Sequence, residues 1–259
     1  MASDVNKSYG WGILGCGWLG QAFAQSLTAA GVSCWGTGRS ASTLKQIQNS
    51  GADAMTWTAG ASSADAWPSC RRLLVAWPPS VGQAAFQQAA AWAKDCEHVV
   101  VISSTSVYPA EPGAYREADA IRRKSPHSGL VLLDVEEEFD AGHTTWLRAG
   151  GLFGPGRHPR QFLRGRPLAD PEGAVNMVHR DDVVRAIAHA ADLRHSGPLN
   201  VVAPVPTSRR SFYAAAGAVP EGEVTHLPQG GRRVLSNALL ETGFTFRHPD
   251  PAEAVLQLD

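Results

Sequence analysis

The chain has 259 residues, of which 44% are hydrophobic, and its formal net charge is −1. The length predicts one large α/β domain, or such a domain with a small appendage, and the apolar content is enough for a sizeable core. A net charge so close to zero argues against a dedicated nucleic-acid or polyanion binder. Residues 1–8 lack the apolar core of a signal peptide, and no apolar run approaches the length of a membrane span. We therefore expect a cytoplasmic protein without nucleic-acid or membrane partners.

The cysteines and histidines give no sign of a metal site. The four cysteines lie far apart in the sequence and form no C-x-x-C pair: Cys16, Cys34, Cys70 and Cys96. The histidines are equally scattered. Buried thiols in a reducing compartment explain this pattern better than disulfides or metal ligands do. We expect no bound metal.

The first predicted elements enclose a glycine-rich turn. Residues 9–16 have the pattern of an apolar strand and residues 18–30 that of a helix. Between them, Gly15 permits a tight turn, Gly17 leaves room for phosphates, and Gly20 lets the helix pack close to the strand. The helix N-terminus also presents N–H groups to an anion. The motif predicts a dinucleotide pyrophosphate site made of Gly15, Cys16, Gly17, Trp18, Leu19 and Gly20, although packing is an alternative role for Trp18.

Strand-like and helix-like segments alternate along the rest of the chain. Further strands are predicted at residues 32–36, 54–58, 73–77, 98–103, 145–149 and 199–202. Further helices are predicted at 42–50, 83–94, 130–139, 181–193, 208–216 and 233–242. This alternation indicates a Rossmann-type doubly wound parallel sheet, which binds its ligand at the carboxyl ends of the strands. We expect a dinucleotide-binding domain of residues 1–155 and about 181–205, and a small discontinuous C-terminal α+β substrate domain of about 156–180 and 206–259.

The end of the second predicted strand indicates which dinucleotide binds. NAD-binding folds usually place an acidic residue here, on the ribose 2′-hydroxyl. This chain has Thr37-Gly38-Arg39-Ser40 instead. An arginine with two hydroxyl groups suits a 2′-phosphate, which an acid would repel. We therefore expect NADP, bound by Thr37, Arg39 and Ser40, and keep NAD as the alternative, in which Arg39 is a solvated loop residue.

Three segments further along the chain resemble one enzyme superfamily. They are ISSTSVY at residues 102–108, RAGGLFGPG at 148–156 and VHRDDV at 178–183. Together with the glycine motif, they are similar to the extended short-chain dehydrogenase/reductase, NAD(P)-dependent epimerase/dehydratase superfamily, and above all to its atypical YeeZ-like branch. The resemblance implies a Rossmann fold and a nicotinamide dinucleotide, and a homodimer is a common arrangement in the family.

The resemblance also implies roles for individual residues. Ser104 matches the hydroxyl that binds the substrate oxygen, although a hydroxyl there can instead satisfy the loop backbone. Gly151 and Leu152 match the segment that passes the nicotinamide, and His179 is a candidate for substrate binding or for a structural hydrogen bond. The residues expected to line the cofactor after the fourth and fifth predicted strands are Trp77, Pro78 and Ser103.

The acid/base pair of the superfamily is absent from this chain. Active members use a Tyr-x-x-x-Lys pair, in which the tyrosine exchanges a proton with the substrate and the lysine lowers the tyrosine pKa. Gly129 and Glu136 fall where the family pattern puts them, which sets Ser128 at the tyrosine position and Leu132 at the lysine position. Serine is far less acidic than a phenol, and leucine carries no charge. The run from Glu136 to Glu138 is expected to be a solvated helix face.

Two other residues are candidates for the missing proton donor. Tyr108 is the phenol nearest the predicted site, although in the superfamily this tyrosine is usually structural. His158 titrates near neutral pH and lies in a basic loop with Arg157 and Arg160. If it faces the cleft, the loop would bind a carboxylate or phosphate of the substrate. Otherwise it is a solvated loop.

These observations favour an NADP-dependent oxidoreductase that acts on a small polar, anionic metabolite, with Ser104 holding the reacting oxygen and Tyr108 or His158 supplying the proton. An NADP-binding sensor or regulatory protein without turnover is the alternative, because the acid/base pair is absent. A sugar-nucleotide epimerase or dehydratase fits less well, since such enzymes need that pair and a roomier second domain.

Overall fold

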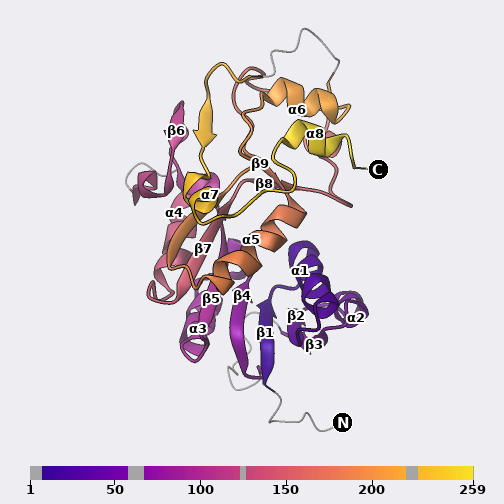
Figure 1. The fold of residues 1–259 in the computed structure, drawn as a ribbon, viewed down its shortest axis with the longest axis vertical. Coiled ribbons are helices and arrows are strands. Elements are labelled where there is room, and N and C mark those ends of the chain that lie inside the picture. Colours follow the sequence, from indigo (N-terminus) through magenta and orange to yellow (C-terminus); the bar gives the residue numbers. More distant parts are fainter. Residues whose placement is uncertain (1–7, 58–66, 123–126, 220–226, 259) are drawn as a thin grey trace. The chain divides into compact units, whose positions relative to one another are not determined.

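The computed structural model describes residues 8–57, 67–122, 127–219 and 227–258 (Figure 1). Its contacts divide the chain into two compact units. Unit 1 consists of Met1–Ser103, Val131–Leu147 and Ile187–Gly197, and unit 2 consists of Ser104–Leu130, Arg148–Ala186 and Pro198–Asp259. These units are defined by contacts alone, so the boundaries expected for a cofactor domain and a substrate domain stay a prediction.

A seven-stranded sheet has the strand order β10-β7-β5-β4-β1-β2-β3. Its strands are β1 (Tyr9–Leu14), β2 (Cys34–Gly38), β3 (Asp53–Thr56), β4 (Cys70–Val75), β5 (His98–Ser104), β7 (Thr144–Ala149) and β10 (Gly197–Val201). Strands β3, β2, β1, β4 and β5 pair in parallel. The chain runs outward from β1 to β3 and then returns to β4 on the other side of β1, which confirms the predicted doubly wound Rossmann-type sheet. This reversal puts a ligand-binding switch point at the carboxyl ends of β1 and β4.

Apolar periodicity explains the helices that flank this sheet. Helix α1 (Trp18–Ala29) buries Leu19, Phe23 and Leu27, which lie four residues apart on one face. Helices α2 (Ala41–Asn49) and α3 (Gln83–Ala93) also belong to unit 1. Helices α4 (His127–Glu137) and α5 (Arg180–Asp192) contribute residues to both units. The 3-10 turn η2 (Pro79–Val81) has Pro78 as its N-cap and lies after the end of β4 at Val75.

Unit 2 is built from short elements. Strand β6 (Gly113–Tyr115) pairs with β11 (Arg232–Val234), and β8 (Gly151–Phe153) pairs with β9 (Met177–His179), both in parallel. The helices are α6 (Arg209–Ala215), α7 (Asn237–Glu241) and α8 (Pro251–Val255), and the 3-10 turns are η3 (Thr105–Val107), η4 (Glu117–Asp119) and η6 (Pro159–Gln161). An apolar cluster joins β8, β9, α6 and α8 and consists of Phe153, Met177, Phe212, Ala216, Ala254 and Val255.

The helix predicted at residues 233–242 is wrong over its first half. Residues 232–234 form β11, and only Asn237–Glu241 are helical. The side chain of Asn176 explains the difference, because its Nδ2 donates to the Arg232 carbonyl at 2.8 Å and its Oδ1 accepts from the Val234 amide at 2.7 Å. Such a tertiary partner overrides local helix propensity. The short strands β6, β8 and β9 and helix α8 were not predicted either.

The four cysteines are free and buried. Burial, with Cys34 nearby, raises the pKa of the Cys16 thiol to about 12, so this thiol in the glycine turn stays protonated at neutral pH. Across the described ranges, no helix has both the length and the apolar character needed to cross a membrane.

Buried His98 makes the stability of unit 1 depend on pH. Burial, reinforced by nearby His143 and Arg72, lowers the His98 pKa from 6.5 to about 4. Between pH 6.5 and pH 4, His98 therefore binds a proton in the unfolded chain but not in the folded chain. The free energy of unfolding keeps its full contribution from neutral His98 above pH 6.5 and loses it as the pH falls toward 4. His98→Gln removes this titration and can still bond the Thr145 hydroxyl, which lies 3.0 Å from His98 Nε2.

We expect urea unfolding to show that the wild-type protein loses about 2 kcal/mol more stability than His98→Gln between pH 7 and pH 5. Equal losses in the two proteins would mean that His98 does not carry the effect.

Candidate functional site

The glycine turn is held in place by strand β2. The Gly15 amide donates to the Thr37 hydroxyl at 2.9 Å, and the Cys16 amide donates to the Thr37 carbonyl at 3.0 Å. The Gly17 amide donates to the Gly15 carbonyl at 2.8 Å. Gly15 has φ +88°, and a Cβ there would lie 2.7 Å from Trp77 Cδ1. A side chain at Gly15 would therefore meet both backbone strain and a collision.

The other two motif glycines differ in what surrounds them. A Cβ on Gly20 would lie 2.7 Å from the Gly15 carbonyl oxygen, so this glycine is needed for the close packing of α1 on the turn. A Cβ on Gly17 would meet nothing within 4 Å. Gly17 is the N-cap of α1, which has neither a side-chain cap nor an acidic residue in its first turn. The open space at Gly17 thus adjoins a helix N-terminus suited to an anion.

A pocket of about 620 Å³ opens beside Gly17 at the carboxyl ends of β1, β2 and β4. A cavity of this size is in the range of small-molecule and cofactor sites. Its lining consists of Gly15, Cys16, Gly17, Thr37, Gly38, Arg39, Ser40, Thr43, Trp57, Ala76, Trp77, Pro78, Ser80 and Val81. The pocket therefore lies entirely within unit 1 and occupies the switch point of the sheet.

The lining contains part of the predicted cofactor set. The members brought together are Gly15, Cys16, Gly17, Thr37, Arg39, Ser40, Trp77 and Pro78. The described lining does not include Ser103. It also does not include Trp18, Leu19 and Gly20, which belong to α1. Gly151 and Leu152 lie on β8 in unit 2. The prediction did not include Gly38, Thr43, Trp57, Ala76, Ser80 and Val81.

The three residues expected at the 2′-phosphate differ in whether their side-chain polar groups are available to a ligand. The Thr37 hydroxyl is buried and occupied, since it accepts from Gly15 and donates to the Ile13 carbonyl at 3.4 Å, so Thr37 supports the turn. Ser40 is the N-cap of α2, and its Oγ accepts from the Thr43 amide at 3.2 Å. Arg39 is exposed at the pocket edge. Arg39 is thus the charged group of this trio that can reach a ligand.

Two stacked tryptophans form an aromatic wall of the pocket. The Trp57 and Trp77 rings lie 4.2 Å apart at an interplanar angle of 20°, and Phe86 meets Trp77 edge-on at 5.9 Å. Both indoles are 6% exposed. Trp57 follows β3, just as Trp77 follows β4, so a large aromatic residue at the carboxyl end of a predicted strand was the sequence signal for Trp57.

The position of helix α4 supports the register inferred for the missing Tyr–Lys pair. In unit 2, a Cβ on Gly129 would lie 2.4 Å from the Ser106 carbonyl oxygen, so only glycine fits there. In unit 1, buried Glu136 accepts a hydrogen bond from Ser103 Oγ at 2.6 Å. Both residues follow the family pattern, and the same register puts buried Leu132 at the lysine position. The expectation that Glu136 is solvated is wrong, because Ser103 offers it a buried donor.

Tyr108 and Ser104 lie in or beside η3. Tyr108 is fully buried, donates to Asn200 Oδ1 at 2.6 Å and accepts from Arg148 Nη1 at 3.3 Å. Burial raises its pKa to about 12. A phenol enclosed in this way does not fit the predicted role of proton donor. Ser104 is half-buried, and its Oγ accepts from the Ser106 amide at 3.2 Å.

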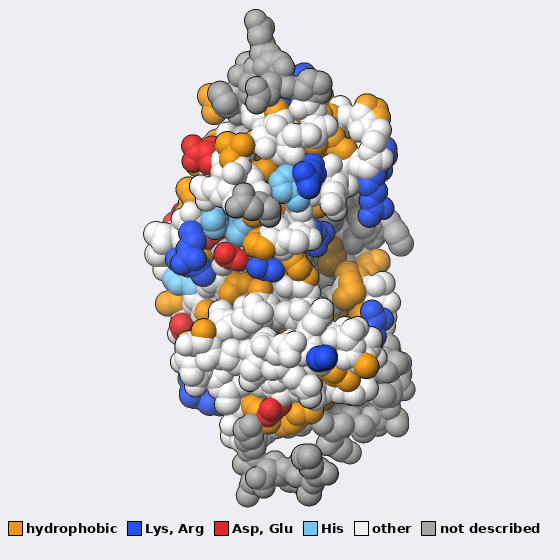
Figure 2. Space-filling view, turned by 90° about the vertical axis from the view of Figure 1, so that its right-hand side faces the viewer, with side chains coloured by type: hydrophobic (Ala, Val, Ile, Leu, Met, Phe, Trp, Pro, Cys, Tyr) orange, Lys and Arg blue, Asp and Glu red, His pale blue; other side chains and the backbone are white. Residues whose placement is uncertain are grey.

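The basic loop contains one partly buried imidazole and two exposed guanidinium groups. His158 Nδ1 accepts from the Arg160 amide at 3.2 Å and so caps η6. Burial, with the charge of Arg160, lowers the His158 pKa. Because Nδ1 is an acceptor, the neutral ring carries its proton on Nε2. Arg157 and Arg160 are exposed. On the face drawn in Figure 2, Lys and Arg side chains with histidines gather in the upper half.

His179, the remaining predicted site residue, lies against a histidine that is distant in sequence. His179 is 3% exposed, and its ring centroid is 4.0 Å from that of His248. Its Nδ1 accepts from the Asp181 amide at 3.2 Å, at the start of α5. Burial is the main cause that lowers its pKa, followed by His248.

Comparison with known proteins gives matches along most of the chain. The sequence profile of a domain of unknown function (DUF1731) matches residues 222–258. YeeZ from Escherichia coli (strain K12) is 29% identical over 264 residues, which cover 92% of this chain and 96% of YeeZ. A functionally unknown conserved protein from Silicibacter pomeroyi DSS superposes with a TM-score of 0.77 at 21% identity, covering 95% of this chain and 97% of that one. The Bordetella bronchiseptica enzyme WbmH, solved in complex with NAD+, gives a TM-score of 0.72 at 15% identity and covers 97% of both chains.

The chain has a doubly wound sheet with a glycine pocket at its switch point, which is the arrangement of a Rossmann-type dinucleotide-binding fold. Its homology to YeeZ extends along nearly the full length of both chains. The chain is similar to YeeZ in sequence and to WbmH in fold, in line with the resemblance of its motifs to the extended short-chain dehydrogenase/reductase, NAD(P)-dependent epimerase/dehydratase superfamily.

Two glycine substitutions should separate ligand binding from folding. Gly17→Val puts a side chain into open space, so we expect it to change the unfolding free energy by no more than about 1 kcal/mol. If the pocket binds NADPH, as the sequence predicts, the same change should weaken that binding roughly 10- to 100-fold. Gly20→Val meets the Gly15 carbonyl and should cost about 1–3 kcal/mol of stability. Urea unfolding and fluorescence titration measure the two effects. Undiminished NADPH binding by Gly17→Val would contradict the placement of the phosphates.

Proposed function

We propose that this protein is an NADP-dependent oxidoreductase that acts on a small polar, anionic metabolite. The observation that favours NADP over NAD is the positive charge of the pocket lining. Exposed Arg39 is the cation among the described lining residues, and no acidic side chain is among them. A 2′-phosphate would gain a charge-assisted hydrogen bond from Arg39 and would meet no carboxylate.

Helix α2 supports the same choice. It starts directly after Arg39 and Ser40, and its first turn has no acidic residue. Its N-terminus is therefore a favourable place for the negative charge that distinguishes NADP from NAD. Ser40 and Thr43 add hydroxyl groups at this edge of the pocket. The aromatic wall of Trp57 and Trp77 offers apolar area against which a planar ring can pack.

The glycine turn fits the pyrophosphate of the cofactor, because the open space at Gly17 is a cradle that any side chain would fill. When bound, the nicotinamide supplies or accepts a hydride at its C4 position. This chain would bind and orient the dinucleotide with the turn, the N-terminus of α1 and Arg39. Ser104 would hold the substrate oxygen through its hydroxyl.

A proton must accompany the hydride, and His158 is the better of the two candidates for supplying it. The Tyr108 phenol is enclosed between Asn200 and Arg148. His158 is half-buried, and to supply a proton its ring would first be protonated on both nitrogens, giving up the bond that Nδ1 accepts from the Arg160 amide and releasing the proton from Nε2. The exposed guanidinium groups of Arg157 and Arg160 beside it would bind a carboxylate or phosphate of the substrate.

The alternative is an NADP-binding sensor or regulatory protein without turnover. The observation that favours it is the register of α4, which puts buried Leu132 at the position of the family lysine. Leucine carries no charge, so the side chain at this position cannot tune the pKa of a proton donor. The two functions share the cofactor site and differ only in whether hydride transfer exceeds background.

Arg39→Ala should change cofactor preference without changing fold. Losing one charge-assisted hydrogen bond of about 1.5–3 kcal/mol corresponds to roughly 10- to 100-fold weaker NADPH binding. NADH, which has no 2′-phosphate, should bind about as before. Quenching of tryptophan fluorescence, with Trp57 and Trp77 in the pocket wall, measures both affinities.

Lys45→Ala is the matched control, because it removes an exposed positive charge from α2 outside the lining. Equal weakening of NADPH and NADH by Arg39→Ala would contradict the 2′-phosphate contact.

The basic loop should control substrate affinity if the protein turns over. A panel of small carbonyl compounds bearing a carboxylate or phosphate is screened for oxidation of NADPH. For any substrate found, Arg157→Ala with Arg160→Ala should raise KM at least about 10-fold, since each ion-paired hydrogen bond contributes about 1.5–3 kcal/mol, and should leave NADPH affinity unchanged. An unchanged KM would remove the anionic preference. Tight NADPH binding with no oxidation across the panel would favour the sensor.

A further inference from the structure

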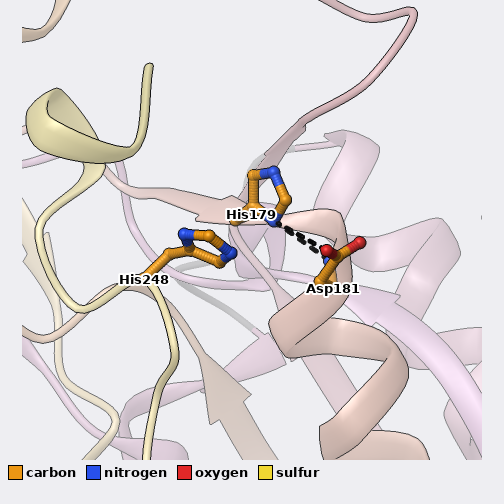
Figure 3. Close-up of side chains that lie close together, drawn as sticks. All are labelled: His179, Asp181 and His248. Atoms are coloured by element: carbon orange, nitrogen blue, oxygen red, sulfur yellow. Dashed lines mark hydrogen bonds and ion pairs between the residues drawn. The ribbon is translucent and has the colours of Figure 1, made fainter. Parts of the chain in front are cut away.

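Unit 2 brings two neighbouring side chains, His179 and Asp181, together with His248, which is distant in sequence. His179, Asp181 and His248 each offer a nitrogen or oxygen atom, and these atoms all lie within 4.8 Å of one another. Figure 3 shows the three side chains converging from β9, from the first turn of α5 and from the segment before α8. This group shares no residue with the glycine pocket, whose lining belongs to unit 1.

Backbone hydrogen bonds to a buried carboxylate hold His248 at this place. Asp182 is fully buried, and its Oδ1 accepts from the Arg247 amide at 2.6 Å while its Oδ2 accepts from the His248 amide at 2.9 Å. Asp182 thereby fixes residues 247 and 248 against the start of α5. The result is a distance of 4.0 Å between the ring centroids of His179 and His248. The cluster is therefore built by the fold and is not an accident of loose surface side chains.

The donor atoms lie close to the separation that a metal ion needs. His179 Nδ1 is 3.9 Å from Asp181 Oδ2. Tetrahedral Zn²⁺, with bonds of about 2.0–2.1 Å, holds its ligand atoms about 3.4 Å apart. The Asp181 side chain is 39% exposed and can close this gap by rotation. Its Oδ1 lies 3.8 Å from Arg180 Nε, which leaves Oδ2 as the ligand atom.

One hydrogen bond has to be given up when an ion binds. His179 Nδ1 now accepts from the Asp181 amide at 3.2 Å, and the ion would take the same lone pair. That amide belongs to the first turn of α5, where N–H groups have no intrahelical acceptor and water can serve them. His248 is half-buried and Asp181 is accessible, so an ion and its water can reach the cluster.

We propose that His179, Asp181 and His248 form a binding site for a divalent transition-metal ion, with Zn²⁺ as the best fit. Two imidazoles and one carboxylate suit zinc and its neighbours in the first transition row, whereas Mg²⁺ and Ca²⁺ prefer oxygen ligands throughout. Three protein ligands leave a fourth position for water. The ion would join the start of α5 to the segment around His248, which lies within residues 222–258, the part matched by the domain of unknown function.

The site is independent of the proposed cofactor, and the experiment keeps the two apart. Untagged full-length protein is treated with a chelator and titrated with ZnCl₂ by calorimetry, in competition with a chromophoric chelator. We expect one Zn²⁺ per chain with a dissociation constant in the micromolar range or below. Co²⁺ in place of Zn²⁺ should give the visible absorption of a four-coordinate ion with nitrogen and oxygen ligands.

Single variants test the ligand set. His248→Ala and Asp181→Asn should each weaken Zn²⁺ binding at least 10-fold and abolish the rise in melting temperature that Zn²⁺ produces in the wild type. His189→Ala, which removes a histidine from the last turn of α5, is the matched control and should bind as the wild type does. Circular dichroism and NADPH titration establish that each variant is folded. If His248→Ala fails to fold, Asp181→Asn, whose side chain is partly exposed, decides the question.

Two outcomes would overturn the proposal. One is the absence of saturable Zn²⁺ binding to the wild-type protein. The other is binding that is equally strong in the wild type, His248→Ala and Asp181→Asn, which would mean that Zn²⁺ binds adventitiously elsewhere on the surface. Neither result would bear on NADP binding, which the Arg39 and Gly17 variants test separately.

Discussion

The cofactor pocket depends on how closely the glycine turn approaches its neighbours. A Cβ on Gly15 would collide with Trp77, one on Gly20 with the Gly15 carbonyl, and one on Gly36 of β2 would lie 2.8 Å from Cys16. Because these positions carry no side chain, the turn can pack against β2, the end of β4 and α1 at once. The same approach leaves open space at Gly17 next to the N-terminus of α1, and this is what a pyrophosphate requires.

Helix α4 has the register of the superfamily pattern that the sequence resembles, although the acid/base pair of that pattern is absent. Gly129 fits against the Ser106 carbonyl, and Glu136 accepts from Ser103, so the helix has the expected register. The side chain at the lysine position is nevertheless leucine. The packing of α4 requires Gly129 and Glu136, whereas only catalysis would require a lysine. The helix can therefore keep its place in the fold without the acid/base pair. The proposed oxidoreductase and the alternative sensor are both compatible with this arrangement, and they differ in whether a residue such as His158 supplies a proton.

Buried carboxylates and phenols organise unit 2. Asp182 binds the backbone of Arg247 and His248, and Tyr108 bonds Asn200 and Arg148. Each of these contacts joins residues that lie tens of positions apart, and each satisfies a buried polar group. They explain why the Tyr108 phenol is enclosed and why two histidines that look unrelated in the sequence have their rings in contact.

The sequence by itself determined the Rossmann sheet, the glycine turn and most helix positions, because hydrophobic period and turn chemistry are local and act between near neighbours. It also indicated Arg39 and the absence of the Tyr–Lys pair, since both follow from short motifs. Only the tertiary structure decided that Trp57 lines the pocket, that Glu136 is buried, that residues 232–234 form a strand, and that His248 meets His179. These features depend on contacts between distant segments, and no local pattern specifies which side chains a folded backbone will bring together.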